Sequence, residues 1–173
     1  MKGFQTPTPK DVVKKSIQEL DKVISLKGKK FLDFGCGKDE RIAKEAKKFS
    51  AKTTAIDKYF GKKIDGLKIS WEDFDVVFFS YGIDEDRVVY KKHKHTNDVM
   101  QFDEVFGLKA TELSKNAIVA ILFEKSDFLL RTKTLPTDKN RSADAFPNLK
   151  AIGNIKHIKG EPFDMYLQLY KKK

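Results

Sequence analysis

Two aspartates and two glycines lie at positions in this sequence that suit the binding of a nucleoside. The segment Asp33-Phe34-Gly35-Cys36-Gly37 stands between an apolar run and a helical pattern, and Asp57 closes the next apolar run. The two aspartates are 57 − 33 = 24 residues apart. Strand, glycine turn, helix, strand and acid is the order of a nucleoside-binding βαβ unit, in which the last carboxylate binds ribose hydroxyls. The pattern therefore predicts a nucleoside cofactor.

The charges around the turn indicate which cofactor it is. A dinucleotide site has a third glycine and a helix N-terminus that is open to pyrophosphate. Here Glu40 holds the third glycine position, and Asp39 and Glu40 already place anions where the helix dipole favours them. With Asp33, three carboxylates surround one turn, which disfavours phosphate and suits an ammonium and a sulfonium. The charges favour S-adenosylmethionine over NAD.

The segment Phe31-Leu32-Asp33-Phe34-Gly35-Cys36-Gly37 resembles the first motif of the class I, seven-strand, S-adenosylmethionine-dependent methyltransferases. The resemblance implies that Gly35 and Gly37 let the backbone approach the methionine moiety, with Cys36 in the turn beside it. It also implies that Asp33 acts near the ammonium group and that Asp57 binds the ribose. A glycine turn in another kind of α/β protein is the alternative.

Hydrophobic patterns predict the elements that position these residues. We expect helices at 10–25, 39–49 and 98–114, strands at 29–34, 52–57, 67–70, 75–81 and 117–123, and a terminal hairpin of 154–158 with 163–170. We expect one domain over 1–173, of which 1–28 form an extended N-terminal segment and a helix. The resemblance implies a Rossmann-like, mostly parallel, seven-stranded sheet with a C-terminal antiparallel hairpin.

One part of the sequence departs from that family. Only 11 residues separate Asp57 from Ile69, too few for an ordinary crossover helix. The fold is therefore expected to be shortened between strands two and three, and the adenine pocket loses a wall there. By position, Trp71 and Glu72, with Asp73 beside them, are candidates to contact adenine. Alternatively, Trp71 belongs to the core.

The resemblance to class I methyltransferases implies that residues 80–84, at the end of the strand at 75–81, handle the acceptor. Ser80 is assigned to the cofactor site, and Tyr81 and Asp84 are assigned as catalytic, forming a mouth for an amine. The segment from Phe4 to Val13, Phe-Gln-Thr-Pro-Thr-Pro-Lys-Asp-Val-Val, resembles the start of small archaeal-type protein-lysine methyltransferases. This similarity implies a protein lysine as acceptor. The alternative is that Tyr81 is core and Asp84 is part of a solvated loop.

Two other functions stay open. Ribose methyltransferases of this fold use a Lys-Asp-Lys-Glu set, and Lys14 or Lys15, Asp84, Lys125 and Glu161 can be fitted to it. That match would make RNA the acceptor. A methyltransferase-like module that binds a partner without catalysis is the third possibility, because the segment after Asp57 is short and the motif after the strand at 75–81 is not distinctive.

Composition narrows the partners. The 173 residues include 35 Lys and Arg against 25 Asp and Glu, a formal charge of +10. This excess suggests an acidic or nucleic-acid-associated macromolecule, RNA included, and the densest basic cluster is 87–95. An apolar segment of membrane-spanning length is lacking, the start does not resemble a signal peptide, and Cys36 is the only cysteine. We expect a cytoplasmic protein with no membrane partner and no metal site.

Overall fold

The first helix forms because its apolar residues recur on one side. In the computed structural model, which describes residues 8–57, 68–81, 89–91, 99–101, 107–124, 148–161 and 164–173, helix α1 spans Lys10–Ile24. Val13, Ile17 and Leu20 on its inner side are buried. The helix ends at Ser25, which has a positive φ of 44°.

A βαβ unit follows α1. Strand β1 (Lys30–Phe34) leads through the glycine turn into α2 (Arg41–Lys48), and β2 (Lys52–Ile56) returns parallel to β1. Ile42 and Ala46 of α2 are buried against the same core as α1. Each predicted boundary lies within two residues of the observed one.

The sheet has six strands in the order β2-β1-β3-β6-β8-β7. The remaining strands are β3 (Val76–Tyr81), β6 (Ile118–Glu124), β7 (Leu149–Ile158) and β8 (Met165–Lys172). The first four strands in the order are parallel, whereas β8 runs antiparallel to β6 and pairs with β7 as a hairpin. A separate two-stranded ribbon pairs β4 (Val89–Lys91) with β5 (Val99–Gln101).

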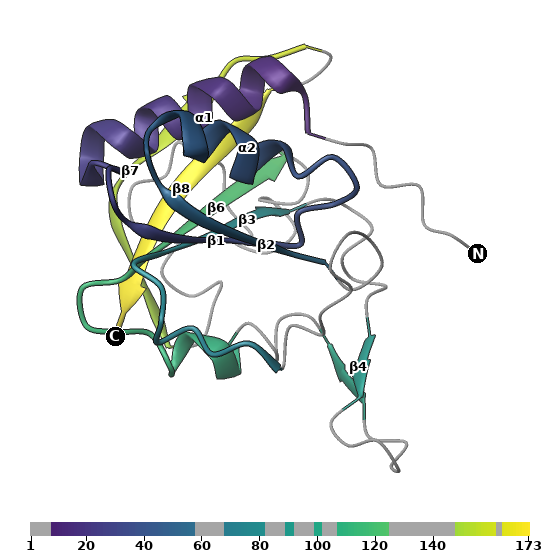
Figure 1. Ribbon diagram of the computed structural model, residues 1–173, viewed down its shortest axis with the longest axis vertical. Helices are drawn as coiled ribbons and strands as arrows, with labels where there is room; N and C mark the ends of the chain where they lie inside the picture. The colour runs from purple at the N-terminus through teal and green to yellow at the C-terminus, as the bar shows by residue number, and fades with distance from the viewer. Residues whose placement is uncertain are drawn as a thin grey trace.

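The two faces of the sheet carry different cores. Helices α1 and α2 cover one face, and residues 107–117 lie on the other (Figure 1). On the helix-covered side, alternate residues of each strand pack with α1 and α2, as Phe31 and Phe78 do. On the other side Phe34 and Phe79 pack with Trp71 and Leu113. The carboxyl ends of β1, β2 and β3 therefore meet at one edge, where the candidate site lies. None of the helices described is long and apolar enough to cross a membrane.

The structure corrects two predictions. Within the described residues the sheet has six strands and a seventh is not observed, because residues 68–70 of the expected third strand are irregular. The next backbone N–H group, that of Trp71, donates to Glu112 Oε2 at 2.9 Å. The expected helix at 98–114 is also wrong at its start: 99–101 form β5, and 107–110 are helical. Val99 has high strand propensity, and its backbone pairs with β4.

Candidate cofactor site

The glycine turn after β1 is tied to the end of β2. The N–H groups of Gly35 and Cys36 both donate to the carbonyl oxygen of Ile56, at 2.9 and 3.0 Å. Gly35 and Gly37 have positive φ values of 77° and 63°, which L-residues rarely adopt. A Cβ on Gly35 would lie 3.2 Å from the Phe79 ring. The turn therefore needs glycine at position 35 for both its backbone angle and its space.

Asp57 faces the glycine turn, as its position after β2 predicted. Its side chain is buried, and Oδ2 accepts a hydrogen bond from the Gly37 N–H at 2.9 Å. A carboxylate held by a backbone N–H is fixed in orientation, as a group that grips ribose hydroxyls has to be. The structure thus brings Asp57 and Gly37 together, and the assignment of this carboxylate to ribose stays a prediction.

Asp33 lies beneath the start of α2. It is 1% exposed, and its Oδ2 accepts the backbone N–H of Ala43 at 2.9 Å. Ala43 is the third residue of α2, so this carboxylate satisfies one of the N–H groups that every helix leaves unpaired at its start. The helix needs this bond because Glu40, the residue before it, has a left-handed φ of 50° and makes no side-chain cap.

The second oxygen of Asp33 is buried without a hydrogen-bond partner among the described residues. Burial raises the pKa of this carboxyl to about 7; the bond from Ala43 lowers it, and the charges of Glu40 and Asp57 raise it further. Near neutral pH the group is therefore divided between its neutral and ionised forms. A cation placed against the free oxygen would favour the ionised form.

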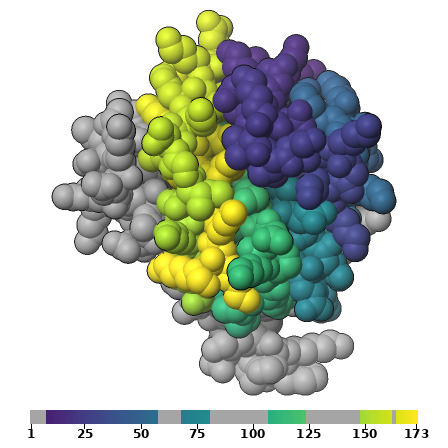
Figure 2. Space-filling model, turned by 90° about the vertical axis from the view of Figure 1, so that its left-hand side faces the viewer, coloured from purple at the N-terminus to yellow at the C-terminus, as the bar shows by residue number. Residues whose placement is uncertain are grey.

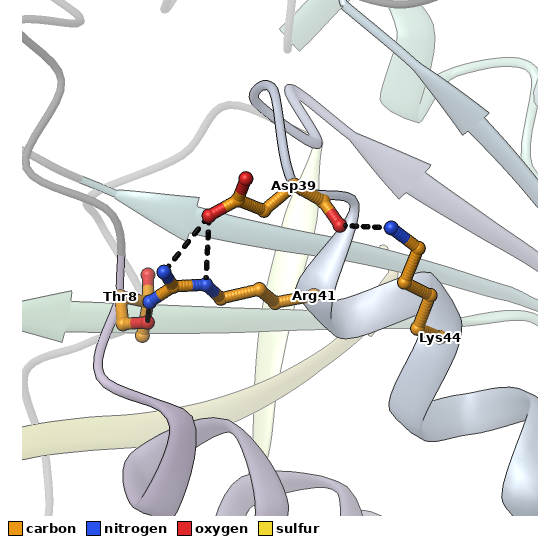
Figure 3. Close-up of polar contacts among 4 residues, drawn as sticks. All are labelled: Thr8, Asp39, Arg41 and Lys44. Carbon is orange, nitrogen blue, oxygen red and sulfur yellow. Dashed lines mark hydrogen bonds and ion pairs between the residues drawn. The ribbon is translucent and has the colours of Figure 1, made fainter.

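Arg41 connects the turn to the residues that precede α1. Its Nε and Nη2 both contact Asp39 Oδ2, at 3.1 and 2.8 Å, and its Nη1 donates to the carbonyl oxygen of Thr8 at 2.9 Å (Figure 3). Lys44 Nζ donates to the carbonyl oxygen of Asp39 at 2.7 Å. The hydroxyls of Thr8 and Ser80 lie 2.8 Å apart, so Thr8 also contacts the end of β3.

Sequence reasoning did not predict that these five residues form a cluster. It singled out Ser80, Asp39 and the motif that contains Thr8, but neither Arg41 nor Lys44. Thr8 and Ser80 are 72 residues apart in the chain. Thr8 lies inside the Pro-Thr-Pro segment that carried the similarity at the N-terminus, which was the available signal. Arg41 had none, because an arginine in the first turn of a helix is ordinarily a solvated charge.

The thiol of Cys36 has no nucleophilic character here. Its Sγ is 3.4 Å from the carbonyl oxygen of Gly37, and the side chain is half-buried. Burial raises its pKa to about 12, and the charges of Asp33, Asp57 and Glu40 act in the same direction. Since a thiolate is the reactive form, the thiol is inert at neutral pH. Its assignment to the cofactor site stays a prediction.

Trp71 and Glu72, the candidates for adenine contact, differ in burial. Trp71 is fully buried and packs edge-on against Phe34, with ring centroids 5.5 Å apart. Glu72 is exposed. This placement supports the alternative in which Trp71 belongs to the core.

Several predicted acceptor residues lie outside the described part of the chain. The backbone of Tyr81 ends β3, but its side chain is not described, and neither are Asp84 and Lys125. Lys14 and Lys15 are exposed on α1, and Glu161 is exposed in the β7–β8 turn. Lys15 Nζ donates to the carbonyl oxygen of Lys159 in that turn at 2.7 Å. No group of three metal-ligating side chains occurs within the described ranges.

Comparison with solved structures identifies the fold. Neither a family model nor a curated protein matches the sequence. A candidate RNA methyltransferase, PH1948 of Pyrococcus horikoshii, is 16% identical with a TM-score of 0.58, over 99% of this chain and 90% of that one. The 1,6-didemethyltoxoflavin-N1-methyltransferase of Burkholderia thailandensis, solved with S-adenosylhomocysteine, is 11% identical with a TM-score of 0.60, over 96% and 80%. The ribosomal protein L11 methylase of Lactobacillus delbrueckii subsp. bulgaricus is 11% identical with a TM-score of 0.58, over 94% and 78%. These proteins act on different acceptors, and what they share with this chain is the methyltransferase fold.

Proposed function

We propose that this protein binds S-adenosylmethionine at the Gly35–Gly37 turn and transfers its methyl group to a macromolecule. The observation that carries the proposal is the free oxygen of Asp33, buried beside the turn and without a partner among the described residues. A buried acceptor in this state is costly unless a ligand or water satisfies it. Structures of the same fold contain this cofactor or its product, as in the S-adenosylhomocysteine complex from Burkholderia thailandensis.

The charges at the turn fit a cationic ligand. Asp33, Asp57 and Glu40 each act on the Asp33 or Cys36 pKa, so all three carboxyls lie within electrostatic range of the turn. The N–H of Ala43, which would otherwise be open to a phosphate, is already bonded to Asp33. A pyrophosphate would meet negative charge and a helix start that is partly occupied. An ammonium and a sulfonium would meet charges of the opposite sign.

The residues present can hold each part of this cofactor. Asp33 would hold the ammonium through the oxygen that the helix does not use. Asp57 would hold the ribose hydroxyls while Gly37 keeps the carboxylate in place. When bound, the cofactor supplies a methyl group on a sulfonium, which needs only an aligned and deprotonated nucleophile. No metal is required for that transfer.

For the acceptor we propose a protein lysine first, on the N-terminal similarity from Phe4 to Val13. Tyr81 and Asp84 would align the amine and help it to lose its proton before attack. RNA is the second candidate, favoured by the charge of +10 and by the fold shared with PH1948, a candidate RNA methyltransferase. A labelled methyl group separates the two, because it would be found either in protein or in RNA after incubation with cell extract.

Calorimetric titration with S-adenosylmethionine, S-adenosylhomocysteine and NAD tests the cofactor. We expect micromolar binding of the first two ligands alone. Asp57→Asn should weaken binding at least tenfold, and Asp164→Asn, at an exposed acid just before β8, is the matched control. Absence of binding in a folded protein would refute the proposal. Equal loss in both variants would refute the assignment of Asp57.

A further inference from the structure

The edge of the sheet opposite the candidate site carries a row of lysines. Parallel strands all begin at one edge, so residues far apart in sequence meet there. Exposed lysines stand at or beside the ends of the strands on this edge. Lys172 and Lys173 lie at and beside the end of β8, and we refer to six others as the lysine edge: Lys27, Lys30, Lys52, Lys115, Lys150 and Lys171. Lys30 begins β1, Lys52 begins β2, and Lys115 precedes β6, whereas Lys150 and Lys171 are at the start of β7 and the end of β8.

Figure 2 shows the molecule from the side of this edge. The end of β8 (yellow) lies beside the segment that precedes β6 (green), with α1 (purple) above. The contact is confirmed by Lys172 Nζ, which donates to the carbonyl oxygens of Thr111 and Leu113. The lysine edge is therefore one continuous side of the molecule.

The lysines of this edge are placed against one another. Lys30 and Lys52 are direct partners in the β1–β2 register, and Lys150 and Lys171 are direct partners in the β7–β8 register. Like charges placed opposite each other destabilise a sheet. None of the six forms an ion pair with another described residue, in contrast to Lys15, Lys22 and Lys48, which all do.

Few acids offset this charge. Asp75 at the start of β3 is half-buried, and its Oδ2 accepts the backbone N–H of Lys30 at 2.8 Å. Asp73 is exposed nearby. Glu72 is exposed beside Asp73, and Glu112 is paired with Lys109, so the six cations of the lysine edge outnumber the acids near them. Repulsion that the fold itself does not relieve would be relieved by a polyanion.

We propose that the lysine edge binds the phosphate backbone of a nucleic acid, at the side of the molecule opposite the cofactor turn. A membrane surface or a protein interface would call for apolar side chains among the charges. The large exposed apolar residues among those described are Val23 and Leu108, and neither is part of this row. Six separate ammonium groups with no aromatic among them suit phosphates and give no base specificity. This inference does not depend on methyl transfer.

The test measures affinity for a labelled 20-nucleotide RNA, and for DNA of the same sequence, by fluorescence anisotropy between 50 and 300 mM NaCl. The variants are K30Q/K52Q and K150Q/K171Q. The control is K10Q/K47Q, which removes the same charge from exposed positions on α1 and α2. Each phosphate contact contributes a salt slope of about 0.7 to 0.9, so losing two contacts weakens binding by roughly 10- to 30-fold at 0.15 M salt. We expect this loss in both edge variants and not in the control.

The outcomes separate the possible partners. Equal binding of RNA and DNA would assign the edge to phosphate alone, and preference for RNA would add contact with the 2′-hydroxyl. If polyglutamate or anionic vesicles compete as well as RNA does, or if K10Q/K47Q loses as much affinity as the edge variants, the proposal is wrong. Asp57→Asn should bind RNA normally, so failure of the cofactor proposal would leave this result unchanged.

Discussion

The buried carboxyl of Asp33 makes the pH dependence of folding a test of the candidate site. We consider Asp33→Asn, which keeps an acceptor for the N–H of Ala43 but removes the proton that titrates. Burial raises the pKa of this carboxyl from 3.8 to about 7. An acid whose pKa is raised by folding stabilises the native state fully below pH 3.8, and this contribution is lost as the pH rises to about 7.

The size of the effect follows from the shift. Three pKa units at about 1.36 kcal/mol each give a change of about 4 kcal/mol as an upper limit. The native protein loses up to this free energy of unfolding between pH 4 and pH 8, and the variant does not. The free energy of unfolding of the variant minus that of the native protein should therefore rise by up to about 4 kcal/mol over this range. The new amide also places a donor where the free oxygen was, which costs about 1 to 3 kcal/mol at every pH. The variant is therefore expected to be less stable in acid, with the difference shrinking or reversing above pH 7.

Urea unfolding at several pH values measures this difference. Trp71 is the only tryptophan and is fully buried, so its fluorescence reports the loss of the core. All other titrating groups are shared by the two proteins and cancel in the comparison. If the two stability curves run parallel from pH 4 to pH 8, Asp33 is ionised in the folded protein as in water, and the reasoning about its burial fails.

The same carboxyl links cofactor binding to pH. An ammonium favours the ionised form, so affinity for S-adenosylhomocysteine should rise roughly tenfold per pH unit below the pKa and level off above pH 7. The affinity of the Asp33→Asn variant should be lower and nearly constant over this range. A native affinity that does not change between pH 5.5 and 7 would show that no cation contacts Asp33.

Three further substitutions have definite expected results. Gly35→Ala should lower the free energy of unfolding by about 1 to 2 kcal/mol, because of its positive φ and the nearby Phe79 ring, and should weaken cofactor binding; an unchanged melting temperature would contradict this. Trp71→Ala should lower the free energy of unfolding by about 3 to 5 kcal/mol, measured by urea unfolding followed by circular dichroism. Trp71→Phe should keep the cofactor affinity within a few-fold of the native value. A large loss of cofactor affinity in Trp71→Phe would return Trp71 to the adenine site. Arg41→Ala should lower the free energy of unfolding by less than about 1 kcal/mol, since the contacts of Arg41 are partly exposed. The same variant should weaken cofactor binding several-fold in calorimetry. Lys48→Ala, which removes an ion pair from the other end of α2, is the control.

Local pattern was enough to predict most of the fold. The buried runs that became β1, β3 and β6 are continuous stretches of apolar residues, and the helix predicted at 10–25 is observed as Lys10–Ile24. In each case the signal lies inside the element itself. The glycine turn and Asp57 were found for the same reason, because the βαβ unit is a local arrangement.

The predictions that failed depended on contacts between distant segments. Residues 99–101 form a strand only by pairing with 89–91, and nothing within three residues distinguishes this from a helix. Residues 68–70 of the expected third strand are irregular, and the N–H of Trp71 that follows them is bonded to Glu112, 41 residues further along the chain. The bond between Asp33 and the N–H of Ala43 could not be predicted either, because the spacing between the two residues does not show which way the carboxyl turns.

The shortness of the strands sets how far apart the two edges of the sheet are. Strand β1 has five residues, which at about 3.3 Å per residue place the start of the glycine turn roughly 16 Å from the lysine at its other end. A polymer held at the lysine edge has to wrap around the side of the protein to bring an atom to the turn. Binding at the lysine edge and methyl transfer at the turn would then involve different segments of one substrate. Shortening an oligonucleotide should therefore lower its affinity step by step. The rate of methyl transfer to a fragment too short to span both edges should no longer depend on salt concentration.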